Sequence, residues 1–287
     1  MGKKFIIYQM LPRLFGNRNS NCVHNGSLAE NGSGKFCDIS VKVLEELKKL
    51  SVTHLWYTGI IRHATDGDKT AKGKAGSPYA IKDYYDVNPY MATHPESRMA
   101  EFEELVSRTH SQGLKVLIDF IPNHLSREYD SAVKPFDDRN FYPGRIHDGD
   151  WTDTVKLNYG SHDTWEKMRD ILMFWAAKGV DGFRCDMVEL VTVDFWEWCI
   201  PQIKKIYPDI IFIAEIYQPH NYHPYIRRGG FDYLYDKSGF YDTLRAISTG
   251  HTPASSLTSV WQGLGDFQHN MLNFLENHDE QRVASDF

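Results

Sequence analysis

Acidic, basic and imidazole side chains gather in four short segments, each at the end of an apolar run. They are Asp119–His124, Arg184–Asp186, Glu215 and Asn277–Asp279. Charged groups at the end of a buried run are costly unless they have a partner or a function. Glycoside hydrolysis requires two carboxylates flanking one bond, because one attacks or activates water and the other protonates the leaving oxygen. If the fold brings these segments together, the chain carries the groups for that chemistry.

Each segment alone has a simpler explanation. A single strand-end aspartate is more often a helix cap or a surface charge, Arg184 could pair with Asp186 without catalysis, and His124 could be a satisfied core histidine. A divalent-metal hydrolase using Asp119, His124, Asp186 and His278 lacks the His-x-x-x-His or His-x-His spacing of such sites. The joint pattern over four strand ends is harder to explain without a shared site.

The elements that must position these groups alternate between short apolar strands and amphipathic helices. Strands are expected at 5–8, 53–57, 114–120, 180–183, 210–214, 231–235 and 271–275, with helices at 39–50, 99–112, 164–178, 193–206 and from about 241. Strict alternation favours an α/β fold with a parallel sheet, and seven such strands fit a (β/α)8 TIM barrel. No Gly-x-Gly-x-x-Gly follows the first strand, so the dinucleotide-binding fingerprint is missing.

Two long insertions follow strands, at about 16–38 and 125–163, and would lie at the carboxyl face of the barrel, where active sites are built. We therefore expect residues 1–124 and 164–287 to form the barrel and residues 125–163 to form a short inserted domain. The sequence stops at Phe287, just after the seventh strand. A barrel needs an eighth strand to close its edges, so we expect a fragment of a longer protein, or a chain that something else completes.

Composition excludes several classes of protein. The chain has 287 residues, of which 41% are hydrophobic and 14% aromatic, so disorder is not its main state. A net charge of −6 offers no basic excess for nucleic acid. No apolar run approaches the length of a membrane span. The four cysteines form no Cys-x-x-Cys pair and are expected to be free thiols. We expect a cytoplasmic protein, or a secreted or periplasmic one if a signal was removed before Met1; the oligomeric state stays open.

The four segments also match, in order, the signature regions of a known family. The sequence resembles the α-amylase superfamily, glycoside hydrolase family 13, and we expect the eighth strand and the C-terminal β domain of that family to be missing from it. The resemblance rests on Asp119–His124, Gly182–Asp186, Ile213–Ile216 and Phe274–Asp279, with Thr154–Asn158 as a fifth motif and Gly76–Tyr84 as the segment that bears an aromatic platform. It covers essentially the whole chain.

The resemblance implies a role for each catalytic residue. Asp186 matches the nucleophile, Glu215 the general acid/base, and Asp279 the carboxylate that stabilises the transition state. Arg184 lies two residues before Asp186, so the two side chains point to the same side of a strand. Its guanidinium is expected to hold Asp186 ionised and to lower the pKa of that carboxyl.

The resemblance also implies how substrate is held. His124 and His278 match residues that bind hydroxyls of the sugar at the cleavage point, and Tyr79 matches the ring that stacks on it. No cofactor is expected to be required. Asn123 sits where many members bind a structural calcium, an ion that takes six to eight oxygen ligands. No such ligand set can be assigned from the sequence, so calcium stays open and no metal ligand is predicted.

The function that follows is a retaining glycosidase. We expect cleavage of α-glucosidic bonds, mainly α-1,4, in starch, glycogen or maltooligosaccharides through a covalent glycosyl-Asp intermediate. Its partner would be an α-glucan. Two alternatives remain: a transglycosylase (glucanotransferase) on the same site, and a catalytically inactive carbohydrate-binding homologue. The presence of all three carboxylates argues against the inactive homologue.

Overall fold

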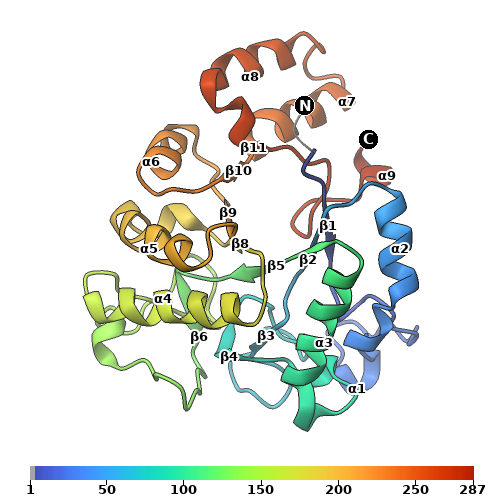
Figure 1. Cartoon of the computed structure of the whole chain (residues 1–287), viewed down its shortest axis with the longest axis vertical. Helices are drawn as coiled ribbons and strands as arrows, with labels where there is room; N and C mark the ends of the chain where they lie inside the picture. Colours follow the sequence, from blue (N-terminus) through green and yellow to red (C-terminus); the bar gives the residue numbers. More distant parts are fainter. Residues whose placement is uncertain (1–3) are drawn as a thin grey trace.

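One curled parallel sheet forms the centre of the computed structural model, which describes residues 4–287 (Figure 1). Its strands lie in the order β1-β2-β5-β8-β9-β10-β11, and every neighbouring pair runs parallel. They are β1 (Ile7–Met10), β2 (His54–Tyr57), β5 (Lys115–Phe120), β8 (Gly182–Cys185), β9 (Ile211–Ala214), β10 (Tyr233–Tyr235) and β11 (Met271–Leu272). The expected fold class, a (β/α)8 barrel with its first seven strands present, is confirmed.

Helices connect the strands and cover the outside of the sheet. In Figure 1, α2 and α3 lie along one side, α4, α5 and α6 along the other, and α7 with α8 at one end. Their bounds are α1 (Leu28–Asn31), α2 (Val41–Lys49), α3 (Arg98–Ser111), α4 (His162–Ala177), α5 (Val193–Ile206), α6 (Tyr222–Arg227), α7 (Asp242–Ser248), α8 (Ser256–Leu264) and α9 (Val283–Asp286). Gly113 and Gly179 follow α3 and α4 with φ of +72° and +87°, the left-handed turn that glycine permits at a helix end. None of the described helices is long and apolar enough to cross a membrane.

Three strands begin two residues later than the apolar runs suggest. They are β1, β8 and β10. β8 also ends two residues later than expected. The charge of Arg184 ends the apolar run, although Arg184 still pairs in register with Asp119 and Ile213. The apolar run at 180–183 therefore covers only the first half of β8 and the two residues before it. Helix α5 has the bounds that the sequence predicts.

The sequence pattern misses two antiparallel hairpins, both beside the carboxyl ends of the sheet. One pairs β3 (Ile61–His63) with β4 (Ile81–Val87), and the other pairs β6 (His124–Ser126) with β7 (Thr154–Lys156). β4 buries Ile81, Tyr84 and Val87 at three-residue spacing, so a search for strict alternation does not find it. The β6–β7 hairpin lies largely within the segment expected to form an inserted domain; the separateness of that domain stays a prediction.

The interior is apolar with a polar end. Trp56 is buried in a cluster with Leu117, Ile213 and Tyr235. All four cysteines are free, as expected: Cys22 and Cys37 are exposed, and Cys185 and Cys199 are buried. The buried charged residues are Asp119, Asp153, Arg184, Asp186, Glu215 and Asp236.

Candidate active site

The carboxyl ends of the strands meet at one cavity of about 360 Å³. Six of the seven residues predicted for the site line it: Tyr79, His124, Asp186, Glu215, His278 and Asp279. The seventh, Arg184, is only 1% exposed and contacts Asp186 and Glu215. Residues nearly 200 positions apart in the sequence thus reach one place because parallel strands end on the same face of the sheet.

Arg184 is the centre of a buried charge cluster. Its Nη1 donates to Asp186 Oδ1 at 2.5 Å, and its Nη2 lies 2.6 Å from Glu215 Oε1. Asp119 Oδ1 is 3.8 Å from Nη1, and Nε donates to the Tyr235 hydroxyl at 3.1 Å. The two terminal nitrogens of one guanidinium therefore hold Asp186 and Glu215 side by side.

One cation is shared by three buried carboxylates. Burial raises the pKa of Asp186, and the charge of Glu215 adds to this rise, while Arg184 opposes it. The expected lowering of the Asp186 pKa is therefore wrong, because the expectation counted the cation but not complete burial or the competing acids. Burial likewise raises the pKa of Asp119 to about 6, against Arg184 and a hydrogen bond of 3.1 Å from the Gly59 N–H.

Glu215 accepts two hydrogen bonds besides its ion pair with Arg184. The Tyr217 hydroxyl donates to Oε1 at 2.7 Å, and the backbone N–H of Met187 donates to Oε2 at 2.8 Å. Met187 directly follows Asp186 and has φ of +41°, a left-handed conformation that is uncommon for a residue with a side chain. This turn directs the Met187 N–H toward Glu215 and so couples the positions of Asp186 and Glu215.

His278 forms the opposite wall with Tyr79. Burial and the charge of Arg184 lower the pKa of His278 to about 3, so the ring is neutral. Gln9 donates to Nδ1 at 2.9 Å, which leaves the proton on Nε2, 2.6 Å from the Tyr79 hydroxyl. The Tyr79 hydroxyl in turn lies 3.5 Å from Asp119. The chain of bonds from Gln9 to Asp119 sets the tautomer of His278.

His124 is also neutral. Burial lowers its pKa to about 4, and its ring lies 5.2 Å from the Trp151 ring, centroid to centroid. A neutral imidazole offers one donor and one acceptor, which suits sugar hydroxyls.

The family model described as "Alpha amylase, catalytic domain" matches residues 9–154 and 145–287, which is nearly the whole chain. The chain belongs to the alpha-amylase family. Among solved structures, an alpha-amylase from Lactobacillus plantarum superposes with a TM-score of 0.81 at 28% identity, covering 99% of this chain and 65% of that one.

Curated relatives within the alpha-amylase family carry more than one name. Alpha-amylase 3 of Dictyoglomus thermophilum is 25% identical over 222 residues, which is 67% of this chain and 42% of the relative. An alpha-1,4-glucan:maltose-1-phosphate maltosyltransferase of Cereibacter sphaeroides is 29% identical over 200 residues, or 64% of this chain and 30% of the relative. The chain thus matches less than half the length of these two relatives.

The residues at Asn123, where calcium was left open, form contacts that do not suit that ion. The Asn123 amide donates to Asp148 Oδ2 at 2.8 Å, and the Lys156 ammonium donates to Asp148 Oδ1 at 2.7 Å. The Lys156 ammonium therefore already neutralises the Asp148 carboxylate. Within residues 4–287, no group of three or more His, Cys, Asp or Glu side chains could hold a metal ion.

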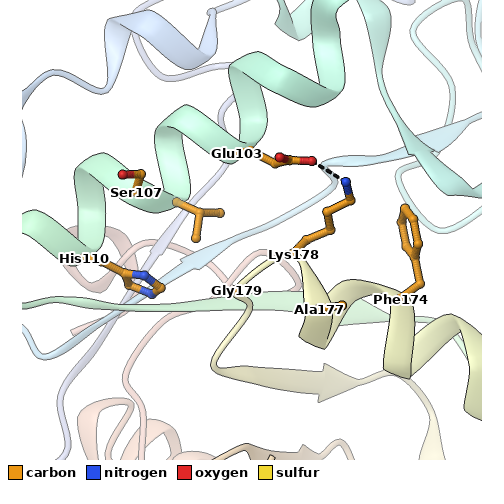
Figure 2. A pocket seen from close by; sticks show the side chains of 8 residues that line it. Glu103, Ser107, His110, Phe174, Ala177, Lys178 and Gly179 are labelled. Atoms are coloured by element: carbon orange, nitrogen blue, oxygen red, sulfur yellow. Dashed lines mark hydrogen bonds and ion pairs between the residues drawn. The ribbon is translucent and has the colours of Figure 1, made fainter.

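A larger hollow lies between α3 and the end of α4, away from these strand ends (Figure 2). It has a volume of about 540 Å³ and is lined by Glu103, His110, Phe174 and Lys178, among others. Its charges are paired, Lys178 with Glu103 and His110 with Asp181 at 2.7 Å. It does not gather the carboxylates of the alpha-amylase-family motifs, so the smaller cavity is the candidate active site.

Sequence reasoning missed several residues of the cavity. Tyr217 is not among the predicted site residues, although an aromatic residue two positions after Glu215 is a usable signal. Asp153 directly precedes the Thr154–Asn158 motif and was not singled out. Lys72 lies in a loop rich in glycine and lysine that carries no local signal of function.

Proposed function

We propose that the chain is the catalytic part of a retaining glycosidase that cleaves α-glucosidic bonds, mainly α-1,4, in starch, glycogen or maltooligosaccharides. The observation that carries the proposal is the pairing of Asp186 and Glu215 on one buried guanidinium inside a cavity. Paired carboxylates on either side of a scissile bond are the common requirement of glycosidases. An α-glucan is the proposed partner.

In this mechanism Asp186 attacks the anomeric carbon while Glu215 gives its proton to the leaving oxygen. The glycosyl–Asp186 ester is then hydrolysed by a water that Glu215 deprotonates, so the configuration is retained. Asp279 stabilises the positively charged, oxocarbenium-like transition state. His124, His278 and Tyr79 orient the sugar at the cleavage point.

This division of roles sets a condition on the protons of the site. Three buried carboxylates face one guanidinium, and burial raises the pKa of Asp186. Burial thus favours the protonated form of Asp186 in the free site. The mechanism needs Asp186 ionised beside Arg184 when substrate is bound, and a proton on Glu215.

The test is proton NMR of maltooligosaccharide hydrolysis, which reports the anomer that forms first. We expect the α anomer from the wild-type chain and no product from Asp186→Asn, with unchanged circular dichroism. Asp138→Asn is the matched control, because its side chain is 94% exposed on the surface. A β anomer formed first, or turnover by Asp186→Asn at the wild-type rate, would contradict the mechanism.

A transglycosylase on the same site is the second candidate. The observation that favours it is the maltosyltransferase among the relatives. In that case the glycosyl–Asp186 ester would pass to a sugar hydroxyl instead of water. Chromatography of the products at high acceptor concentration separates the two, since only transfer lengthens the acceptor.

We also propose that no bound calcium is needed near Asn123. Lys156 supplies the positive charge that Asp148 requires, and its side chain is partly buried there. Residues 125–163 are proposed to be the short inserted domain of the barrel, with the β6–β7 pairing as its base.

A further inference from the structure

A single π-helical turn, Lys237–Tyr241, follows β10 and leads into α7. Asp236 fixes the start of this turn. Its carboxylate is fully buried and accepts a hydrogen bond from the Phe240 N–H at 2.9 Å, and its backbone carbonyl accepts one from the Tyr241 N–H at 3.1 Å. Short π-helical segments are rare and frequently lie at functional sites. The proposed chemical step uses no group from this turn, so its role is unassigned.

The first contact of the turn leads to Glu215. The Ser238 hydroxyl donates to the backbone carbonyl of Tyr217 at 2.5 Å, and the Tyr217 hydroxyl donates to Glu215 Oε1 at 2.7 Å. Residues 215–218 belong to no helix or strand, so no ladder of backbone hydrogen bonds fixes them. Ser238 therefore restrains the backbone of the residue that orients the proposed acid.

The second contact leads to Asp279. Lys237 Nζ lies 3.1 Å from Glu280 Oε1, and the two side chains are only 22% and 11% exposed, so water screens this ion pair little. Arg245 Nη1 lies 3.7 Å from Glu280 Oε2, which makes Lys237 the nearer of these two cations. Glu280 directly follows Asp279, and the backbone N–H groups of both donate to Asn277 Oδ1. Lys237 thus anchors the segment that carries Asp279.

The sheet order explains why one turn reaches both segments. β10 lies between β9 and β11 (Figure 1), so its carboxyl end lies between the segment that carries Glu215 and the one that carries Asp279. Two consecutive residues, Lys237 and Ser238, contact the two sides. Catalytic groups keep their geometry only when neighbouring residues hold them within about 0.5 Å. A short turn pinned by a buried aspartate can supply that restraint.

We propose that the turn after β10 positions two of the three catalytic carboxylates. Lys237 is a positioning residue for Asp279, through Glu280. Ser238 is a positioning residue for Glu215, through Tyr217. This inference rests on the proposed function and deepens it. Neither Lys237 nor Ser238 is among the residues that line the cavity, so each acts through another residue.

The test compares two leaving groups on one glycone. Release of glucose from maltotriose needs an acid, whereas α-maltosyl fluoride loses fluoride without a proton. In Ser238→Ala we expect kcat/KM to fall about 3- to 10-fold on maltotriose, the range for one lost hydrogen bond, and to stay within about twofold on the fluoride. In Lys237→Met we expect kcat/KM to fall about 10- to 100-fold on both substrates, because Asp279 stabilises the transition state whatever group leaves.

Asp242→Asn is the matched control for Lys237→Met. Lys237 Nζ also donates to Asp242 Oδ1 at 2.6 Å, but the Asp242 side chain is 47% exposed and belongs to α7, so both substrates should be hydrolysed as by the wild type. Lys237→Arg keeps the charge and Ser238→Thr keeps the hydroxyl, so each should restore most of the lost rate. Circular dichroism checks that every variant is folded. If Lys237→Met is not, Glu280→Gln removes the same ion pair and should show the same equal loss.

The outcomes separate this inference from the proposed function. A wild-type chain that hydrolyses maltotriose, while either folded variant matches it, overturns the inference and leaves the proposed function standing. An equal loss on both substrates in Ser238→Ala also overturns the inference, because it would show a general loosening of the site and not a misplaced acid. A wild-type chain that acts on neither substrate overturns both. A loss confined to maltotriose in Ser238→Ala, with an equal loss on both substrates in Lys237→Met, supports the inference.

Discussion

Arg184→Met tests whether one guanidinium stabilises the whole acidic cluster. Methionine keeps the length and apolar character of the stem but removes the charge. Asp186, Glu215 and Asp119 would then remain buried without a cation. Removing one partner of a buried ion pair costs about 3–5 kcal/mol, against a total stability of about 5–15 kcal/mol for typical domains. We expect a loss of this size in the free energy of unfolding at pH 8.

The pH dependence gives the sharper part of this test. Burial raises the pKa of Asp119 to about 6 and also raises that of Asp186. A carboxyl whose pKa is raised by folding favours the folded state while it is protonated, and this contribution is lost as the pH rises through the folded-state pKa. At pH 5 the Asp119 and Asp186 carboxyls are largely neutral, so the Arg184 guanidinium contributes less to the free energy of unfolding. The loss caused by Arg184→Met should therefore shrink to below about 2 kcal/mol at pH 5.

Urea unfolding followed by circular dichroism at pH 5 and pH 8 measures both effects. Arg139→Met is the matched control, because Arg139 pairs with Asp137 on the surface and its side chain is 70% exposed. The control should match the wild type within error at both pH values. A destabilisation by Arg184→Met under about 1 kcal/mol at pH 8, or an equal one at both pH values, would refute the shared-cation reasoning.

Three further predictions concern the acid, the proposed replacement of calcium and the packing of the sheet. Glu215→Gln should lose about 100-fold or more on maltooligosaccharides and far less on an activated glucosyl fluoride, since a good leaving group needs no proton; steady-state kinetics showing equal losses would count against the acid role. Excess EDTA should leave the melting temperature unchanged, whereas Lys156→Met should lower it by several degrees, because Asp148 loses its cation; a calorimetric scan in which EDTA has the larger effect would reverse this view. Gly182→Ala should destabilise the sheet by about 1–3 kcal/mol, because a Cβ would lie 2.4 Å from Ile211 Cγ1 and 2.7 Å from Ile211 O; unchanged urea unfolding would show that β8 and β9 can move apart.

The sequence predicts the elements and the acidic residues because both depend on local pattern. Helix α5 and the strand-end acids Asp186 and Glu215 follow directly from apolar runs and the polar groups that end them. The sequence pattern does not predict β4, because the buried residues of this strand recur every three positions instead of every two. The strand contacts β3 and β6 as well as α3 and α4, and local alternation does not describe burial by neighbours of this kind.

The electrostatics of the site could not be predicted from neighbours in the sequence. Arg184 is two residues from Asp186, and this proximity suggested a lowered pKa. Whether the Arg184 guanidinium also contacts Glu215 and Asp119 depends on the pairing of β5, β8 and β9. The burial of Asp186 depends on the whole barrel. Likewise, Lys72 and Asp153 are 81 positions apart, and they meet only because the segment between β3 and β4 lies beside the segment before β7.

The hydrogen bond between Gln9 and His278 has a consequence for how the protein is made. Its partners are 269 residues apart in the chain, and β1 and β11 are the two outer strands of the sheet. At a synthesis rate of about 5–20 residues per second, Gln9 waits about 13–54 s on the ribosome before His278 exists. Contacts between such distant positions also close the largest loops during folding. The wall of the candidate active site that His278 forms is thus missing until residue 278 has been synthesised, even if the helices and strands before it have already folded.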